Sequence, residues 1–287
     1  MESSPCHEGN APLIRHLTAP FWLMAQRLRP TTLPPPGAFR ILLLHDIAPR
    51  QEAALDRLLA HIGATAGFMT PDDVPARLAM TAPDGACPIL TSFDDGFASN
   101  HALAKAVLDR HGVKALFFIC PGLMDLPRAQ QPAAVAASVF RGKAEAVPEM
   151  MTWDQVVELA ARGHVIGAHG MTHIRLAGLD PARLEDEIVG SQLRLTGQLG
   201  RRADWFAFPF GDIGSVDKPV LDVVARHFRY CRSGVRGLNR AGTSPFGLLA
   251  QHVDMDAPLA YQRMALGGGL DMRHAEARRL LEVMIRD

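Results

Sequence analysis

Short apolar runs alternate with amphipathic segments from residue 39 to the end of the chain. The apolar runs have the length of strands and are nearly continuous, which indicates strands buried on both faces. They lie at residues 39–46, 88–90, 114–120, 164–168, 205–208, 228–232 and 248–253. Between them, apolar positions recur every three or four residues, as on the buried side of a helix. Helices are therefore predicted at residues 54–62, 100–111, 152–163, 180–200, 220–227 and 274–285.

Strands that alternate with helices need crossover connections, and such connections produce a mainly parallel sheet. We therefore expect an α/β fold in which the loops after the strands gather at one rim of a barrel. The length of 287 residues suits one large domain, which we place at residues 39–287 after an N-terminal arm of residues 1–38. Residues 121–150 are rich in proline and alanine and have little periodicity, so a long loop is expected there.

The N-terminal arm contains one amphipathic stretch. Residues 13–28 predict a short helix with Leu17, Phe21 and Met24 on one face, before three consecutive prolines at 34–36. Packing of this helix against the domain is the expected arrangement. Its arginines leave open an alternative in which the arm lies on a membrane surface.

Composition narrows the range of functions. Thirty Lys and Arg residues balance thirty Asp and Glu residues, so no basic excess points to nucleic acid. The four cysteines stand far apart in the chain, as is typical of reduced, buried thiols. The N-terminal residues do not resemble a secretory signal, and no apolar run approaches the roughly 20 residues of a membrane span. We therefore expect a cytoplasmic protein that does not bind nucleic acid.

Two adjacent carboxylates follow the predicted strand at 88–90. They are Asp94 and Asp95, and Gly96 after them allows the chain to turn. Two like charges at a buried strand end repel each other, so one of them needs a cation or a proton. Taken alone, such a pair of aspartates would more often be solvated turn residues or a helix cap. Ser99 or Asn100 could also cap the helix that follows.

Two histidines four residues apart, His169 and His173, follow another predicted strand. The glycines at 167 and 170 favour a loop here, which would allow both imidazoles to converge on one ion. Two imidazoles and one carboxylate form the ligand set of an open catalytic zinc site, which keeps a water molecule in its remaining position. This reading requires the aspartate pair and the two histidines to meet at the same rim.

Three segments, in this order, carry a family resemblance: Thr-Ser-Phe-Asp-Asp-Gly at 91–96, the pair His169 and His173, and Phe-Ala-Phe-Pro-Phe-Gly at 206–211. They resemble the first three motifs of the polysaccharide deacetylase family, the NodB-homology domain of carbohydrate esterase family 4. The resemblance extends from about residue 39 to about residue 254. It implies a distorted (β/α)7 barrel and a metal-dependent hydrolase that removes an acetyl group from an N-acetylated sugar or oligosaccharide.

The resemblance also implies roles for individual residues. Asp95, His169 and His173 would hold the metal, which we expect to be zinc, with cobalt or nickel as alternatives. The ion would lower the pKa of a bound water molecule towards about 7, and Asp94 would act as the general base. The metal and the backbone N–H of Phe210 would stabilise the tetrahedral oxyanion.

The leaving amine must be protonated, and we expect His45 to be the general acid. Most of the family has an apolar strand that ends in His-Asp near the C-terminus, whereas here such a strand comes first, at residues 41–46. This order resembles the circularly permuted branch that includes bacterial poly-N-acetylglucosamine deacetylases. His252 is a competitor for the same role, and the alternative for His45 is an ordinary histidine at a strand end.

Two positions depart from the family pattern. Ala207 stands where the third motif usually has an arginine that holds the base, so the residue that orients Asp94 is open. Gly170 replaces the usual serine or threonine after the first histidine, which would loosen the metal-binding loop.

Two other functions stay open at this point. A hydrolase with the same metal and water could cleave a non-sugar amide or a cyclic imide instead. A relative that binds carbohydrate without turnover is the alternative outside enzymes, although it would not need an intact aspartate and histidine set. Aromatic residues are only 6% of the chain, which favours a short substrate over a long stacked groove.

Overall fold

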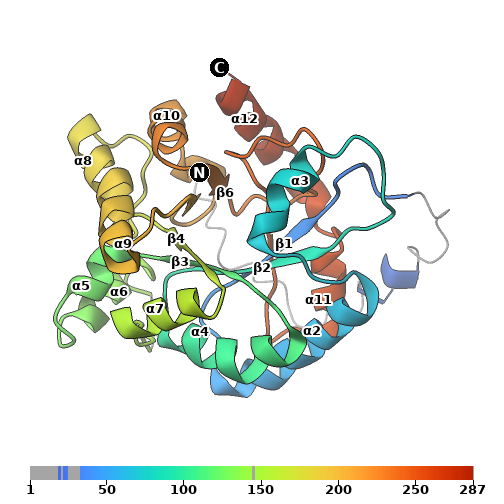
Figure 1. Ribbon diagram of the computed structural model, residues 1–287, viewed down its shortest axis with the longest axis horizontal. Helices are drawn as coiled ribbons and strands as arrows, with labels where there is room; N and C mark the ends of the chain where they lie inside the picture. The colour runs from blue at the N-terminus through green and yellow to red at the C-terminus, as the bar shows by residue number, and fades with distance from the viewer. Residues whose placement is uncertain (1–18, 21, 25–32, 144–145, 287) are drawn as a thin grey trace.

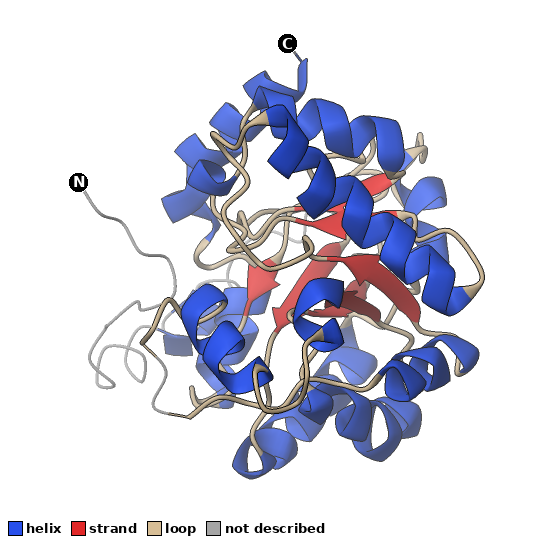
Figure 2. Cartoon of the chain, turned by 90° about the vertical axis from the view of Figure 1, so that its left-hand side faces the viewer, coloured by secondary structure: helices blue, strands red, loops and turns tan. Residues whose placement is uncertain are grey.

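The computed structural model describes residues 19–20, 22–24, 33–143 and 146–286. A seven-stranded sheet forms the centre of the molecule, and helices surround it (Figures 1 and 2). Its strands are β1 (Arg40–Leu44), β2 (Ile89–Phe93), β3 (Leu116–Ile119), β4 (Val165–Ala168), β5 (Trp205–Ala207), β6 (Tyr230–Arg232) and β7 (Gln251–His252). Each strand coincides with or overlaps one of the apolar runs that predicted it.

The sheet is parallel throughout and runs in the order β6-β5-β4-β3-β2-β1-β7. The first strand, β1, lies between β2 and the last strand, β7, with Leu43 opposite His252. Arg232, at the end of β6, forms a parallel bridge with Leu248, shortly before β7. The sheet therefore curls round towards closure, and the expectation of a distorted (β/α)7 barrel is confirmed.

Side chains along each strand alternate between two apolar clusters. Ile41 and Leu43 belong, with Phe118, to a cluster in which strand residues from β1, β2, β3 and β5 predominate. Leu42 and Leu44 belong to the larger cluster, which also contains the buried side chains of the surrounding helices. Because successive side chains of a strand point to opposite faces, the first cluster fills the barrel and the second joins barrel to helices. Both faces of the sheet are thus covered, as the nearly continuous apolar strands predict.

The helices cover the outside of the barrel (Figure 2). Helix α7 begins at the capping box of Thr152, whose hydroxyl oxygen accepts the Gln155 N–H, and Asp180 caps α8 in the same way. From residue 33 onwards, the α-helices outside the 121–150 segment are α2 (Glu52–Thr65), α3 (Val74–Leu78), α4 (Ala98–Leu103), α7 (Trp153–Ala161), α8 (Pro181–Glu185), α9 (Ser191–Leu199), α10 (Lys218–His227), α11 (Leu259–Leu266) and α12 (Ala275–Arg286).

Two of the predicted helices contain a π-helical turn. The helix expected at 100–111 is α4, a π-turn at Ala104–Leu108 and a short 3-10 turn, and it ends at the left-handed Gly112. The helix expected at 180–200 is divided in the same way into α8, a π-turn at Asp186–Gly190 and α9. A π-turn re-aims the side chains near it and is often found at functional sites.

The expectation of a long loop at 121–150 is wrong. This segment contains α5 (Pro121–Asp125) and α6 (Gln131–Ser138). In both helices proline stands in the first turn, where its missing N–H has no partner to lose. The alanines of α6 favour a helix by propensity, and a helix with only Gln131 and Val135 buried gives little periodicity to detect.

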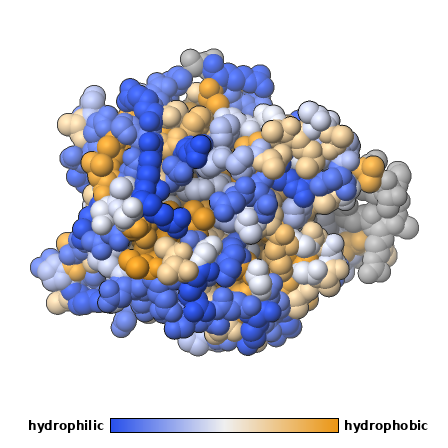
Figure 3. Space-filling model, in the orientation of Figure 1, coloured by the Kyte–Doolittle hydropathy of each residue, from blue (hydrophilic) through white to orange (hydrophobic). Residues whose placement is uncertain are grey.

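The N-terminal arm is described only in part. Residues 19–20 and 22–24 are helical, Ala19 is buried, and Trp22 packs against the core. The rest of the helix predicted at 13–28 lies outside the described residues. The face of the molecule seen in Figure 3 is mostly hydrophilic, with apolar side chains in small patches. In the described part of the chain, every helix is too short or too polar to cross a membrane.

The packing of β4 gives a prediction about stability. A Cβ atom at Gly167 would lie 2.7 Å from ring carbons of Phe118 and 2.9 Å from the carbonyl oxygen of Trp205. We therefore expect Gly167→Ala to lower the free energy of unfolding, measured by urea denaturation, by about 1–3 kcal/mol. Gly197→Ala on α9 is the matched control, because no atom lies within 4 Å of its added carbon. It should raise stability by about 0.4–1 kcal/mol, and equal effects of the two substitutions would contradict this account of the barrel packing.

Candidate active site

The two carboxylates after β2 are buried. Asp94 is 3% exposed and Asp95 is 2% exposed, so neither is a solvated turn residue. The backbone N–H of Asp94 donates to the carbonyl oxygen of Leu44 at the end of β1, which holds the turn against the neighbouring strand. Asp95 and Gly96 have φ values of 74° and 87°, and this left-handed turn ends β2.

Asp95 lies beside both histidines of the predicted pair. Its Oδ1 atom is 3.3 Å from Nε2 of His173 and 3.6 Å from Nε2 of His169. One ligand atom from each of the three residues lies within 4.8 Å of the other two, and all three side chains are buried. Ligands of a tetrahedral zinc ion lie about 3.4 Å from one another, since each is about 2.0–2.2 Å from the ion.

The chemistry of these donor atoms fits a divalent cation. Oδ1 of Asp95 is buried and has no hydrogen-bond partner among the described residues. Burial by itself would raise the pKa of this carboxyl group, but His173, His45 and His169 lower it below its ordinary value. Burial also lowers the pKa of His169 to about 4. An ionised carboxylate and a neutral imidazole are the forms that bind a metal ion.

The orientation of His169 is fixed from behind. Its Nδ1–H donates to the carbonyl oxygen of Ala207, at the end of β5, over 2.8 Å. The lone pair of Nε2 therefore faces the two carboxylates. Ala207, which stands where the third motif usually has an arginine, thus orients His169 through its backbone carbonyl group. Ala207 itself offers no side chain that could hold Asp94.

Arg232 is the residue that holds Asp94, and the sequence reasoning missed it. Its guanidinium Nη2 atom donates to both carboxylate oxygens of Asp94, over 2.6 and 2.5 Å, and the Arg232 side chain is fully buried. Arg232 is the last residue of β6, so it reaches the same rim as Asp94 from the other side of the barrel. A signal was available, because Arg232 is a charged residue at the end of an apolar run.

A second buried group that the sequence did not single out supports the histidine loop. Glu187, in the π-turn between α8 and α9, is fully buried. Its carboxylate accepts hydrogen bonds from the backbone N–H groups of Met171 and Thr172 and from the Thr172 hydroxyl. The buried Glu187 carboxylate therefore fixes the backbone of the loop between His169 and His173. Gly170, which we expected to loosen this loop, has a φ of 72°, and a Cβ atom there would lie 3.3 Å from a carboxylate oxygen of Glu187. A serine or threonine at this position would therefore be strained and crowded.

Phe210 lies in a turn after β5 and next to the histidines. Its ring centroid is 4.6 Å from that of His173. Phe210 and His173 have φ values of 66° and 58°, the conformation that Asp95 also adopts. A non-glycine residue in this region costs about 1–2 kcal/mol, and such residues cluster at functional sites. The strained backbone thus coincides with three of the predicted site residues.

His45 and His252, the two candidates for the general acid, lie side by side. Their ring centroids are 5.4 Å apart, because β1 and β7 are neighbours. The side-chain amide of Asn100 donates to the backbone carbonyl oxygen of His45 and fixes the backbone there. Asn100 does not cap α4, because the N-cap position is Phe97. His45 is one of the three histidines that lower the pKa of Asp95.

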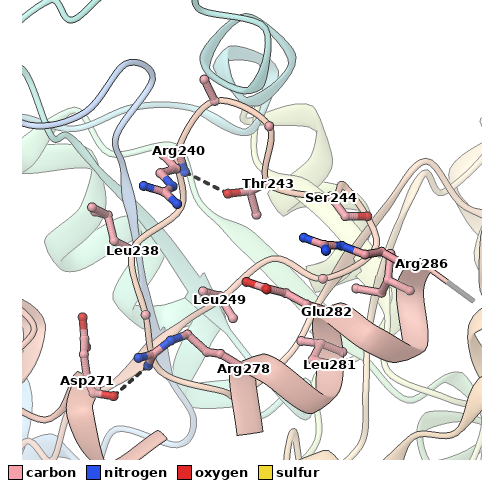
Figure 4. Close-up of a pocket in the computed structure, with 15 residues that line it drawn as sticks. Leu238, Arg240, Thr243, Ser244, Leu249, Asp271, Arg278, Leu281, Glu282 and Arg286 are labelled. Atoms are coloured by element: carbon pink, nitrogen blue, oxygen red, sulfur yellow. Dashed lines mark hydrogen bonds between the residues drawn. The ribbon is translucent and has the colours of Figure 1, made fainter. Parts of the chain in front are cut away.

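A separate pocket of about 560 Å³ lies between the chain segment 237–249 and α12 (Figure 4). Arg240, Arg278 and Arg286 line it together with Asp271 and Glu282. Arg278 already donates to two backbone carbonyl groups. None of the predicted site residues lines this pocket, so it is distinct from the carboxylate and histidine cluster.

The Arg232–Asp94 pair gives a prediction about stability. Arg232→Gln leaves a buried carboxylate without its cation, and we expect a loss of about 3–5 kcal/mol in the free energy of unfolding, measured with a chelator present. The double variant Arg232→Gln/Asp94→Asn should lose less than the sum of the two single variants. Arg175→Gln is the matched control, because the Arg175–Asp212 pair has the same chemistry but is 38% and 20% exposed. Its loss should stay below about 1 kcal/mol, and additive losses in the double variant would contradict the pairing.

The chain resembles known proteins in sequence and in fold. The model of the family described as polysaccharide deacetylase matches residues 82–227, which contain the aspartate pair, both histidines and Phe210. The protein YxkH of Bacillus subtilis (strain 168), which is described as a polysaccharide deacetylase, is 25% identical to this chain over 186 residues. That alignment covers 61% of this chain and 58% of YxkH, so the chain spans less than two thirds of its relative.

Solved structures share the fold. IcaB from Ammonifex degensii aligns with a TM-score of 0.59 and 23% identity, over 79% of this chain and 95% of IcaB. The Streptococcus pyogenes deacetylase PplD, solved in complex with acetate, aligns with a TM-score of 0.62 and 18% identity, over 80% of this chain and 98% of PplD. At these identities the two structures support the fold only. The family match extends over just over half of the chain, and the chain therefore belongs to the polysaccharide deacetylase family.

Proposed function

We propose that this chain is a metal-dependent hydrolase that removes the acetyl group from an N-acetylated sugar or oligosaccharide. The observation that carries the proposal is the buried cluster of Asp95, His169 and His173 with a second carboxylate, Asp94, on its border. Membership of the polysaccharide deacetylase family supports a carbohydrate amide as the substrate. It also supports a hydrolase that acts on a carbon–nitrogen bond outside peptides.

Asp95, His169 and His173 would hold the ion, which we propose to be zinc, with cobalt or nickel as alternatives. When bound, the ion supplies Lewis-acid chemistry, which activates water and polarises the amide carbonyl group. Asp94 borders this cluster, with its Oδ2 atom 3.7 Å from Nε2 of His169.

Asp94 is the proposed general base. The Arg232 guanidinium group fixes both of its oxygens and stabilises their negative charge. A base must be ionised and held within reach of the proton that it takes. Because Arg232 bonds Asp94 from the side of β6, the carboxylate cannot turn towards solvent without losing a buried ion pair.

Phe210 is proposed to donate its backbone N–H to the developing oxyanion. No described residue accepts a hydrogen bond from this N–H, and the ring of Phe210 contacts that of His173. His45 is proposed to protonate the leaving amine. Its ring lies beside that of His252, because β1 and β7 are paired. His252 is therefore the alternative residue for the same role.

Two alternatives rest on the same residues. The cluster would also support hydrolysis of a non-sugar amide or a cyclic imide. A carbohydrate-binding relative without turnover would have no use for the buried and strained arrangement of Asp95, His173 and Phe210. Acetate release from N-acetylglucosamine oligomers, abolished by a chelator and restored by zinc, distinguishes the first proposal from both alternatives.

The roles of base and ligand are separable by substitution. Asp94→Asn should lower turnover about 10²–10⁴-fold, because the water loses its base, while the metal content stays near that of the unchanged protein. His169→Ala should remove both turnover and metal, because the cluster loses a ligand. His61→Ala on α2 is the control for loss of a histidine. Metal content by elemental analysis and acetate release are the measurements, and full turnover by Asp94→Asn would refute its role as base.

The choice of general acid is separable in the same way. His45→Ala should reduce turnover about 10²-fold or more, because the amine leaves unprotonated, and should leave the metal content unchanged. His252→Ala is the matched control, since the two rings lie together at the end of adjacent strands. Acetate release from an activated ester should be much less sensitive to His45→Ala than release from the amide. If His252→Ala gives the larger loss, the acid is His252.

A further inference from the structure

The ring of Phe210 lies under two guanidinium groups at the rim of the barrel. The Cζ atom of Arg141 is 4.0 Å from the ring centroid, and that of Arg175 is 5.6 Å away. Arg175 is bound to both carboxylate oxygens of Asp212, so its charge is compensated. No acidic side chain pairs with Arg141 among the described residues, which omit residues 144–145. Arg141 is exposed, and its contact with the aromatic face holds it in place.

The backbone at Arg141 adopts a conformation that favours glycine. Arg141 follows α6 with a φ of 53°, and the N–H of Gly142 donates back to the carbonyl oxygen of Ala136. This is the left-handed end of a helix, where glycine is the usual residue because a Cβ atom is disfavoured. An arginine at such a position is strained, and strain of this kind is retained mostly where a side chain has a function.

The segment that carries Arg141 is fixed to the turn of the two aspartates. The ring of Phe140 stacks on Phe97, with centroids 6.1 Å apart. Phe97 forms an antiparallel bridge with Met150, and the N–H of Met151 donates to the carbonyl oxygen of Gly96. The guanidinium group of Arg141 is therefore held at a defined place, and one aromatic ring, that of Phe210, separates it from His173.

We propose that Arg141 binds an anionic substituent, a carboxylate or a phosphate, on the sugar substrate beside the N-acetyl group that is hydrolysed. This inference rests on the proposed function and names its substrate class. The face of the guanidinium group is occupied by the Phe210 ring, which leaves its N–H edge for two parallel hydrogen bonds to an oxyanion. Because the group is already ordered by the ring and the backbone, binding costs little further conformational entropy. The formal net charge of the chain is zero, so no overall positive charge adds to the attraction by Arg141.

The test compares charged and neutral probes on the zinc-loaded full chain, in an Asp94→Asn background that prevents turnover. The carboxylate probe is a tetrasaccharide in which glucuronic acid alternates with N-acetylglucosamine, and its neutral partner is the N-acetylglucosamine tetramer. The phosphate probe is N-acetylglucosamine 1-phosphate, with N-acetylglucosamine as its neutral partner. Dissociation constants are measured by calorimetry at low and at high salt.

Arg141→Gly should weaken binding of the preferred anionic probe about tenfold and remove most of its salt dependence. Binding of the neutral probes should change less than about twofold. The melting temperature should stay the same or rise, because glycine relieves the strained backbone, so the loss cannot come from unfolding. Arg141→Lys should retain part of the affinity, since it keeps the charge without the planar fork. Arg279→Gln, an exposed arginine on α12, is the control and should change nothing.

The probe that loses affinity on Arg141→Gly identifies the anionic group. The inference is overturned if Arg141→Gly binds both anionic probes as tightly as the unchanged protein does. It is also overturned if neither anionic probe binds the unchanged protein at millimolar concentration. The proposed function is tested separately, by acetate release from the tetrasaccharides with Asp94 intact. Absence of release refutes the hydrolase, whereas the binding comparison still decides the role of Arg141.

Discussion

Two carboxylates buried side by side at the end of β2 impose the main electrostatic constraint on this structure. Neither Asp94 nor Asp95 can be desolvated without positive charge or hydrogen-bond donors close by, because an unpaired buried carboxylate costs several kcal/mol. The protein meets this requirement differently for the two residues. Arg232 pairs with Asp94, whereas Asp95 faces two imidazoles and keeps one oxygen without a hydrogen bond. This asymmetry supports different roles for two chemically identical neighbours.

The parallel barrel makes this asymmetry possible. All of its strands point the same way, so the residues that follow them meet at one rim although they are distant in sequence. Arg232 reaches Asp94 from β6, and His169 is oriented by the backbone of β5. Each partner comes from a rigid strand end. The positions of the charged groups are thereby fixed before any substrate binds, which is the arrangement that electrostatic catalysis requires.

The loops above the rim are held by buried polar side chains. Glu187 binds the backbone between the two histidines, and Asn100 binds the backbone of His45. These contacts balance the strain of the left-handed residues at the site, of which Asp95 and His173 are two. Arg141 follows the same principle, since a strained backbone and the aromatic face of Phe210 hold its charged side chain at the rim.

The sequence by itself determined the strands, the capped helices and the placement of Asp94, Asp95, His169 and His173 at strand ends. These features are local, because each depends on hydrophobic period, on capping residues or on a short motif at a strand end. The tertiary structure alone decided which cation pairs with Asp94, because Arg232 lies 138 positions away and meets it only when β6 and β2 are placed around the barrel. It also decided that the segment 121–150 contains two helices, α5 and α6, and that Arg141 reaches Phe210. Such contacts depend on strand order and on the direction of each side chain, and no local pattern encodes them.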